Sequence, residues 1–447
     1  MVERYHSVRL VSDLCQGCVS CIKRCPTEAI RIRGGKARIT ETRCIDCGEC
    51  IRRCPNHAKT AFTDSLADLE HFRYNIALPA PSLYAQFPLE HSIERILCAL
   101  VNIGFDEVFE VAQGAEIVSL AIRDYLTRHD IPRPAISSAC PASVRLIQVK
   151  YPELIEHLIP IDAPVEVAAR VARANAMQEI GLESDEIGVW FITPCPAKMT
   201  AVQQPLGSEK SNLTGAIGIA KIYKALLQAI PSGPSGEVEP RCKRASWVGI
   251  GWALSGGEAS AVEATNALTI DGIENVNEIL DQIAIGKLRD IEFVELLACA
   301  GGCIGGSLTV ENRFVAENRM KKRSKKLKEE DAAKGLAPRQ GYRESELGND
   351  ERRAIEPRPI LRLDEDISLA MYKVDIMEKT LARLPGLDCG SCGSPNCKAL
   401  AEDIVQGNAV ETDCVFKLRE RVRDLAQEMV NLAAKLPPSL EKETPKE

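Results

Sequence analysis

The sequence has no long hydrophobic run, because no stretch approaches the about 18 uncharged apolar residues that a membrane span needs. Its amino terminus also lacks the basic segment and apolar run of a signal peptide, so we expect a cytoplasmic location. An excess of positive charge is absent too, since the formal net charge is -7, which argues against a nucleic-acid binder. With 447 residues, of which 45% are hydrophobic, the chain is expected to form several soluble globular domains.

Cysteine, in contrast, is abundant, with 18 residues. In a reducing cytosol, cysteines in a long chain serve as metal ligands or redox centres before they serve as disulfides. Two amino-terminal runs have the spacing C-x2-C-x2-C-x3-C-P, and their members are Cys15, Cys18, Cys21, Cys25, Cys44, Cys47, Cys50 and Cys54. This spacing is typical of two-cluster bacterial ferredoxins, whose fourth cysteine in each run binds the other cluster. We therefore predict two 4Fe-4S clusters, since a zinc site would show isolated cysteine pairs.

A third set of cysteines lies near the carboxyl terminus and consists of Cys389, Cys392, Cys397 and Cys414. Glycines and Pro395 are expected to hold the first three in a tight loop. Residues 398–412 are predicted to form a helix that returns Cys414 to this loop. We expect one more 4Fe-4S cluster here, and a four-cysteine zinc site is the alternative.

Four further cysteines follow short apolar stretches at residues 134–136, 187–192 and 291–297, and they are Cys140, Cys195, Cys299 and Cys303. We expect them at the ends of strands, where loops begin. Converging there, their thiolates would hold a fourth cubane, although each cysteine alone is typical of a small buried side chain. The two cysteines left over are Cys98, predicted to lie in the core, and Cys242, predicted to be a surface thiol.

The segments around these four cysteines resemble the three signature loops of FeFe hydrogenases, over about residues 74–373. In that family the catalytic H-cluster joins a 4Fe-4S cubane to a diiron unit with CO, cyanide and azadithiolate ligands. The resemblance implies that the four cysteines bind the cubane and that Cys303 bridges to the diiron unit. It also implies that Lys198 bonds one cyanide and that Pro81 and Ser82 hold the other. Gly302 would let the backbone approach the cofactor closely.

The sequence departs from the highly active members at the proton path. Ala139 occupies the position of their proton-delivering cysteine, and alanine has no titratable group. Ile122, Tyr125 and Ala163 occupy the other relay positions. Positioned acid-base groups contribute about 10²–10⁴ each to rate, so we expect slow turnover. This combination resembles the sensory branch of the family.

Two remaining segments suggest contacts with partners. Residues 317–357 interrupt the resemblance and are highly charged, which predicts a solvated helix, a mobile loop or a docking surface for a redox partner. Beyond Cys414, apolar residues alternate at spacings of four and three, at Leu418, Val422, Leu425, Met429, Leu432 and Leu436. This seam predicts a helix that packs on its own domain, pairs with a second copy or binds a partner.

The predicted fold is α/β, with a two-lobed hydrogenase-like core between an α+β bacterial ferredoxin domain and a small helical iron-sulfur domain with a coiled-coil helix. The predicted boundaries are 1–63 for the ferredoxin domain, 74–375 for the core with its charged insertion at about 317–357, 376–416 for the carboxyl-terminal cluster, 417–436 for the heptad helix and 437–447 for a tail.

The predicted activity is slow, reversible conversion of H2 to protons and electrons, suited to hydrogen or redox sensing. Electrons would pass through 4Fe-4S clusters to a ferredoxin-like or other redox partner. One alternative is a hydrogenase-like electron-transfer or iron-sulfur assembly protein without the diiron unit. Another is a fully catalytic subunit whose protons travel through Glu295, or through Tyr125 with water.

Overall fold

The computed structural model of the chain describes residues 5–230, 244–348, 354–358 and 363–435. Its contacts divide the chain into two compact units, which are described separately. The first unit contains Met1–Leu14 and Glu41–Ile360, and the second contains Cys15–Thr40 and Leu361–Glu447. The predicted ferredoxin-like segment therefore contributes residues to both units, and the predicted domain boundaries remain predictions.

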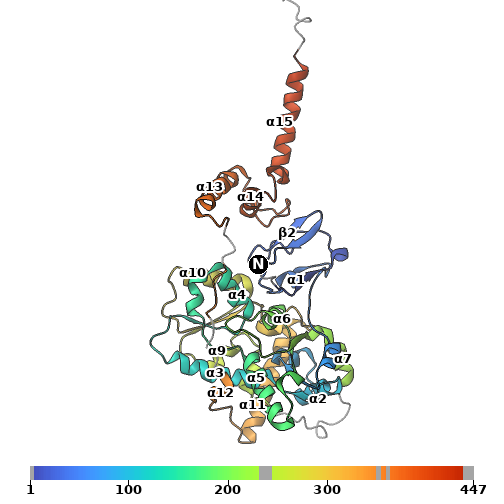
Figure 1. Cartoon of the computed structure of the whole chain (residues 1–447), viewed down its shortest axis with the longest axis vertical. Coiled ribbons are helices and arrows are strands. Elements are labelled where there is room, and N and C mark those ends of the chain that lie inside the picture. The colour runs from blue at the N-terminus through green and yellow to red at the C-terminus, as the bar shows by residue number, and fades with distance from the viewer. Residues whose placement is uncertain (1–4, 231–243, 349–353, 359–362, 436–447) are drawn as a thin grey trace, which may run out of the picture. The chain divides into compact units, whose positions relative to one another are not determined.

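The first unit is built on two parallel sheets (Figure 1). The four-stranded sheet has the order β6-β5-β8-β9, and the three-stranded sheet has the order β10-β11-β7. The strands are β5 (Tyr74–Pro79), β6 (Glu107–Val108), β7 (Ala135–Ile136), β8 (Ile187–Thr193), β9 (Gly215–Gly218), β10 (Ala267–Asp271) and β11 (Phe293–Leu297). Parallel strands joined through helices confirm the predicted α/β class.

Strand β8 is the centre of the larger sheet because both of its neighbours and both of its faces are covered. It pairs with β5 in a register that runs from Tyr74 opposite Ile187 to Pro79 opposite Ile192. All seven residues of β8 are buried. A continuous apolar run of this kind is expected for a parallel strand covered by helices on both faces.

Helices and a short antiparallel pair complete the first unit. They are β1 (Val8–Leu10), β4 (Lys59–Ala61), α1 (Glu49–Arg53), α2 (Ile93–Asn102), α3 (Val111–Leu126), α4 (Pro141–Lys150), α5 (Pro164–Ile180), α6 (Pro196–Gln203), α7 (Ile219–Ala229), α8 (Trp247–Gly251), α9 (Gly257–Val262), α10 (Ile273–Ala284), α11 (Arg313–Ala333) and α12 (Glu344–Leu347). Cys98 is buried on α2, as predicted, whereas Cys242 lies outside the described residues.

Helix α11 shows that part of the charged segment belongs to the core. Its buried residues recur at helical spacing and are Ala316, Met320, Arg323, Leu327 and Asp331. Met320 and Leu327 join the main apolar cluster, and the Arg323 guanidinium donates a hydrogen bond to the Pro88 carbonyl at 2.9 Å. The other face of the helix is exposed, so the predicted helix is present but solvated on one side only.

The second unit combines a hairpin with helices. Its elements are β2 (Ile30–Arg33), β3 (Lys36–Ile39), α13 (Ile367–Arg383), α14 (Cys397–Val405) and α15 (Val415–Ala433). Helix α14 ends at Val405, so the predicted helix over 398–412 was too long. Gly407 adopts φ +76° there, and the Asn408 amide donates to the Asp403 carbonyl at 2.7 Å, which closes the last turn.

Helix α15 leaves its apolar seam exposed. The exposed seam residues are Leu418, Val422, Leu425, Met429 and Leu432, whereas Leu436 lies outside the described residues. No residue of α15 is buried, so in the described part of the chain the seam does not pack on its own unit. Within the same described residues, no helix is long and apolar enough to cross a membrane.

The packing of α11 can be tested by Met320→Ala. Because Met320 has no exposed surface, its truncation leaves a cavity in the core, and we expect a loss of about 2–5 kcal/mol in the free energy of unfolding. Lys322→Ala, an exposed position on the same helix, is the matched control. Denaturant titration of both variants measures the effect, and equal midpoints would contradict the burial of this segment.

Candidate metal-cluster site

Four strand ends converge on one cavity in the first unit. The segments that follow β5, β7, β8 and β11 line a cavity of about 100 Å³. Ligands in parallel α/β folds bind at the carboxyl ends of the strands, which is where this cavity lies. The structure brings together all four predicted cubane ligands here, namely Cys140, Cys195, Cys299 and Cys303. The remaining predicted core residues, Pro81, Ser82, Ala139, Lys198 and Gly302, line the same cavity.

Local sequence explains how two of the cysteines are held. Cys140 and Cys195 each precede the first residue of a helix, α4 and α6, and each is followed by proline. Proline suits the first helical position because its missing N–H would lack an intrahelical partner there and its φ is already helical. The repeated order of strand, cysteine, proline and helix therefore fixes both thiols at the cavity wall.

Two glycines line the cavity but serve the packing of its loops. A Cβ at Gly302, whose φ is +77°, would lie 2.9 Å from the Ala253 carbonyl oxygen. A Cβ at Gly306 would lie 2.4 Å from the Pro194 carbonyl oxygen. These contacts lie with neighbouring loops, so the glycines let the third cysteine loop close against the other segments of the wall.

Burial and neighbouring cysteines raise the pKa values of three of these thiols, namely Cys195, Cys299 and Cys303. Burial, followed by the neighbouring Cys299 and Cys140, raises the pKa of Cys195 to about 12. Burial and the other three cysteines likewise raise the pKa of Cys303 well above its ordinary value. Four thiolates in an apolar cavity therefore need a bound cation, and metal ions deprotonate coordinating thiols. The donor set fits an iron-sulfur cluster.

Polar groups at the wall fit a ligand with acceptor atoms. Ser82 is fully buried, and its hydroxyl has no hydrogen-bond partner among the residues that the structure describes. The Lys198 ammonium donates a hydrogen bond to the Ala139 carbonyl at 2.9 Å, which holds it beside the cysteine loops. An unpartnered buried hydroxyl is costly unless something in the cavity bonds to it.

The substituted relay positions do not supply a proton path to this cavity. Ala139 lines the wall without a titratable group, and Ile122 is buried in an apolar cluster. Ala163 caps α5 and has no polar side chain. Burial raises the pKa of Tyr125, and this residue is absent from the described lining of the cavity.

Sequence reasoning missed Glu258 and Ser137, which lie beside Ala139. Ser137 Oγ lies 2.8 and 2.7 Å from the two carboxylate oxygens of Glu258, and the Ala139 amide donates to Ser137 Oγ at 3.2 Å. Glu295, which was considered as a relay, lines the same cavity as Glu258. A signal was available, because Glu258 is the single charged residue between positions 245 and 262.

Both buried glutamates have raised pKa values, so their protonation changes near neutral pH. Burial, followed by the Glu295 carboxylate, raises the pKa of Glu258 to about 8. Burial also raises the pKa of Glu295, although the Ala259 and Gly256 amides donate to it at 2.8 and 3.2 Å. Two carboxyls that exchange protons near neutral pH can act as acid and base.

The second cysteine run of the amino-terminal segment adjoins the cavity. Cys47 lines it, and the Arg52 guanidinium donates to the Gly305 carbonyl at 2.9 Å. Asp46 accepts hydrogen bonds from the Val8 amide at 3.0 Å and from Thr200 on α6 at 2.9 Å. These contacts attach the second run to the loops that carry Cys195 and Cys299.

The other cysteine runs have the hydrogen bonds that cluster thiolates receive. The Ala29 and Ala58 amides lie 3.2 Å from the sulfur atoms of Cys25 and Cys54. In the second unit, three of the four carboxyl-terminal cysteines pack in one apolar cluster, namely Cys392, Cys397 and Cys414. Hydrogen bonds to sulfur and limited solvent exposure are factors that set cluster potentials. The predicted exchange of Cys25 and Cys54 between clusters remains a prediction.

Comparison with known families also separates the cysteines into an amino-terminal, a central and a carboxyl-terminal group. The model for the iron only hydrogenase large subunit, C-terminal domain, matches residues 73–263 and 255–307. A 4Fe-4S dicluster domain matches residues 7–55, and an Fe-S cluster family matches residues 384–416. The chain therefore belongs to the FeFe hydrogenase family of iron-sulfur oxidoreductases.

Individual relatives are distant. Iron hydrogenase 1 of Clostridium pasteurianum is 23% identical over 257 residues, which cover 47% of this chain and 44% of that protein. The NADP-reducing hydrogenase subunit HndD of Solidesulfovibrio fructosivorans is 22% identical over 377 residues, covering 74% and 61%. A solved variant of FeFe-hydrogenase HydA1 from Chlamydomonas reinhardtii gives a TM-score of 0.49 at 14% identity, covering 66% and 98%. The chain thus spans less than two thirds of the length of the Clostridium pasteurianum and Solidesulfovibrio fructosivorans proteins.

The buried glutamates predict a pH dependence of stability. The unfolded carboxyl loses its proton near its ordinary pKa of 4.5, whereas folded Glu258 keeps it to about pH 8. Between these values the folded state binds more protons, so the free energy of unfolding falls as pH rises. The slope is about 1.4 kcal/mol per pH unit for each retained proton.

Glu258→Gln should reduce this slope, because an amide has no proton to lose. Thermal unfolding between about pH 5 and 8 measures it. Part of the slope should remain, since buried Glu110 also has a pKa raised to about 7. Glu263→Gln, whose side chain is 70% exposed, is the control and should keep the wild-type slope. An unchanged slope in Glu258→Gln would contradict the retained proton.

Proposed function

We propose that this chain interconverts H2 with two protons and two electrons at an H-cluster held in the cavity of the first unit. The observation that carries the proposal is the convergence of Cys140, Cys195, Cys299 and Cys303 on one apolar cavity. Lys198 and the unpartnered Ser82 hydroxyl line the same cavity. The cofactor, a 4Fe-4S cubane joined to a diiron unit with CO, cyanide and azadithiolate, would supply the site at which hydrogen is cleaved or formed.

The residues of the wall hold and shield this group. The four thiolates would hold the cubane, and Cys303 would also contact the diiron unit. Lys198 and Ser82 donate hydrogen bonds to its cyanide ligands, with Pro81 beside Ser82 and Gly302 closing the third loop. Apolar side chains of the lining, among them Phe191 and Leu297, exclude water and so strengthen these charge-assisted bonds.

Protons travel through the buried glutamates in place of the missing cysteine at Ala139. Glu258 and Glu295 line the cavity, and Ser137 fixes the Glu258 carboxylate by hydrogen bonds. Gly256 and Gly257, which directly precede Glu258, line a second, polar cavity of about 480 Å³, and Glu116 lines this cavity too. This arrangement supports a route from solvent to the cofactor that differs from the one in the highly active members, because it uses Glu258 instead of a cysteine at position 139.

Electrons travel through the iron-sulfur clusters of the other cysteine runs. Cys47 of the second run lines the cavity, so a cluster held by Cys44, Cys47 and Cys50 would adjoin the H-cluster. The first run, with Cys54, and the carboxyl-terminal cysteines hold the two remaining 4Fe-4S clusters. A ferredoxin-like or other redox partner in the cytoplasm exchanges electrons with this chain.

A slow reaction coupled to redox partners suits hydrogen or redox sensing. The exposed apolar seam of α15 provides the contact for output, through a second copy of the chain or a partner helix. The alternative, an electron-transfer or assembly protein without the diiron unit, keeps the cubanes. It leaves the buried Ser82 hydroxyl without a ligand, which favours the hydrogenase.

Infrared spectroscopy tests the cofactor. In protein matured anaerobically with the diiron unit, we expect the stretching bands of bound CO and cyanide. Lys198→Met should shift the cyanide bands, because the ammonium that bonds cyanide is lost. Lys221→Met is the control, since Lys221 bonds the Thr63 carbonyl away from the cavity. Absence of all these bands in the matured wild type would contradict the hydrogenase proposal and would favour an electron-transfer or assembly protein without the diiron unit.

Hydrogen turnover tests the proton route. Glu258→Gln should lower turnover by about 10²-fold or more while the infrared bands remain, because an amide cannot relay a proton. Ala139→Cys should raise turnover by restoring a titratable group beside the cofactor. Glu263→Gln, exposed at the opposite end of α9, should behave as wild type. Equal rates in Glu258→Gln and wild type would contradict the route through Glu258.

A further inference from the structure

In the second unit, the carboxyl-terminal cysteine loop rests on the segment that follows the first cysteine run. The Ile32 amide of β2 donates a hydrogen bond to the Gly393 carbonyl at 2.7 Å. Gly393 has φ +82°, and a Cβ there would lie 2.2 Å from the Ile32 carbonyl oxygen. The two backbones therefore meet at a distance that only glycine permits.

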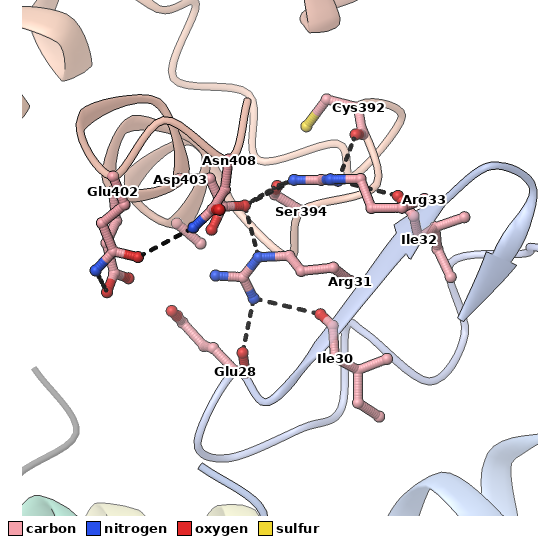
Figure 2. Close-up of polar contacts among 12 residues, drawn as sticks. Glu28, Ile30, Arg31, Ile32, Arg33, Cys392, Ser394, Glu402, Asp403 and Asn408 are labelled. Atoms are coloured by element: carbon pink, nitrogen blue, oxygen red, sulfur yellow. Dashed lines mark hydrogen bonds and ion pairs between the residues drawn. The ribbon is translucent and has the colours of Figure 1, made fainter. Parts of the chain in front are cut away.

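Buried ion pairs fix this contact (Figure 2). Arg31 and Arg33 of β2 reach the same Asp403 carboxylate oxygen of α14 at 2.7 and 2.8 Å, and Asp403 is only 7% exposed. Ser394 donates to that oxygen at 2.8 Å, and Arg33 also donates to the Cys392 carbonyl at 3.2 Å. Buried pairs of this kind penalise any arrangement that separates the partners, so they select one docking geometry.

Lys23 joins the two cysteine runs directly. It stands between Cys21 and Cys25, and its ammonium donates to the carbonyls of Asp388 and, at 2.7 Å, of Pro395. Asp388 directly precedes Cys389 of the carboxyl-terminal run. The same lysine thus lies beside cysteines of both runs.

We propose that this junction, made by Lys23, Arg31, Arg33, Gly393 and Asp403, holds the carboxyl-terminal cluster against the first ferredoxin cluster for direct electron exchange. The inference rests on the proposed function, because it takes both cysteine runs to hold 4Fe-4S clusters. One electron passes from the reduced cluster to the oxidised one, with no proton transferred and no bond made or broken. The carboxyl-terminal domain is then part of the electron path, and the basic side chains ease the repulsion between two anionic clusters.

Electron paramagnetic resonance of the full chain tests this junction. The anaerobically reconstituted protein is reduced, and its spectrum is compared with that of Cys397→Ser combined with Cys414→Ser, which lacks the carboxyl-terminal cluster. We expect a magnetic interaction in the wild type that the double variant loses. Asp403→Asn should lose the interaction with its iron content unchanged, because the guanidinium groups of buried Arg31 and partly buried Arg33 no longer face a carboxylate. Asp375→Asn, an exposed position on α13, is the matched control and should keep it.

Hydrogen exchange supplies a second readout that does not depend on the clusters' spins. The Ile32 amide should exchange about tenfold faster or more in Asp403→Asn than in the wild type or Asp375→Asn. A wild-type spectrum equal to the sum of isolated clusters would overturn the proposal, as would an interaction that persists in Asp403→Asn. Zinc in place of iron at the carboxyl-terminal site would overturn it too. Missing CO and cyanide bands would instead contradict the proposed H-cluster, and they would not change the magnetic resonance signals of the two 4Fe-4S clusters. The failure of the proposed function and the failure of this inference are therefore distinguishable.

Discussion

The burial of four thiols in one apolar cavity is the constraint on which the remaining structure depends. Each thiol is delivered by a loop at the carboxyl end of a parallel strand, so the two sheets must present their ends to the same point. Burial and mutual repulsion raise the pKa values of Cys195, Cys299 and Cys303, and only a bound cationic group relieves that cost. The prolines after Cys140 and Cys195 and the glycines of the third loop serve this convergence.

The proposed proton and electron paths meet at this cavity, and they resemble those of the highly active members to different degrees. The electron side adjoins the cavity through Cys47 and Arg52, whose contacts attach the second ferredoxin run to the cysteine loops. The proposed proton side lacks a cysteine at Ala139, and the buried carboxyl next to this loop is Glu258, which Ser137 holds by hydrogen bonds. Cysteine ligands that are kept beside an altered proton side are consistent with the slow, sensing role proposed above.

Cysteine spacing allowed the amino-terminal and carboxyl-terminal runs to be predicted, because ligand geometry imposes short, fixed separations along the chain. The four cavity cysteines lie far apart in the sequence, and their prediction came from the resemblance of their segments to the signature loops. The strand ends at Ile136, Thr193 and Leu297 were predictable too, since each follows an apolar run. Glu258 was missed because its partner Ser137 lies 121 residues away, a contact that no local pattern encodes. The buried face of α11 was concealed by its many charges, and the end of α14 at Val405 depends on a left-handed glycine turn.

The most direct test of the account is anomalous scattering at the iron edge from crystals grown and kept without oxygen. The account predicts a peak of several irons enclosed by the sulfur atoms of Cys140, Cys195, Cys299 and Cys303. It predicts additional iron density next to Cys303 after maturation, within reach of Lys198 and Ser82. A cavity that contains no iron, or a single zinc ion among these sulfur atoms, would contradict the central claim.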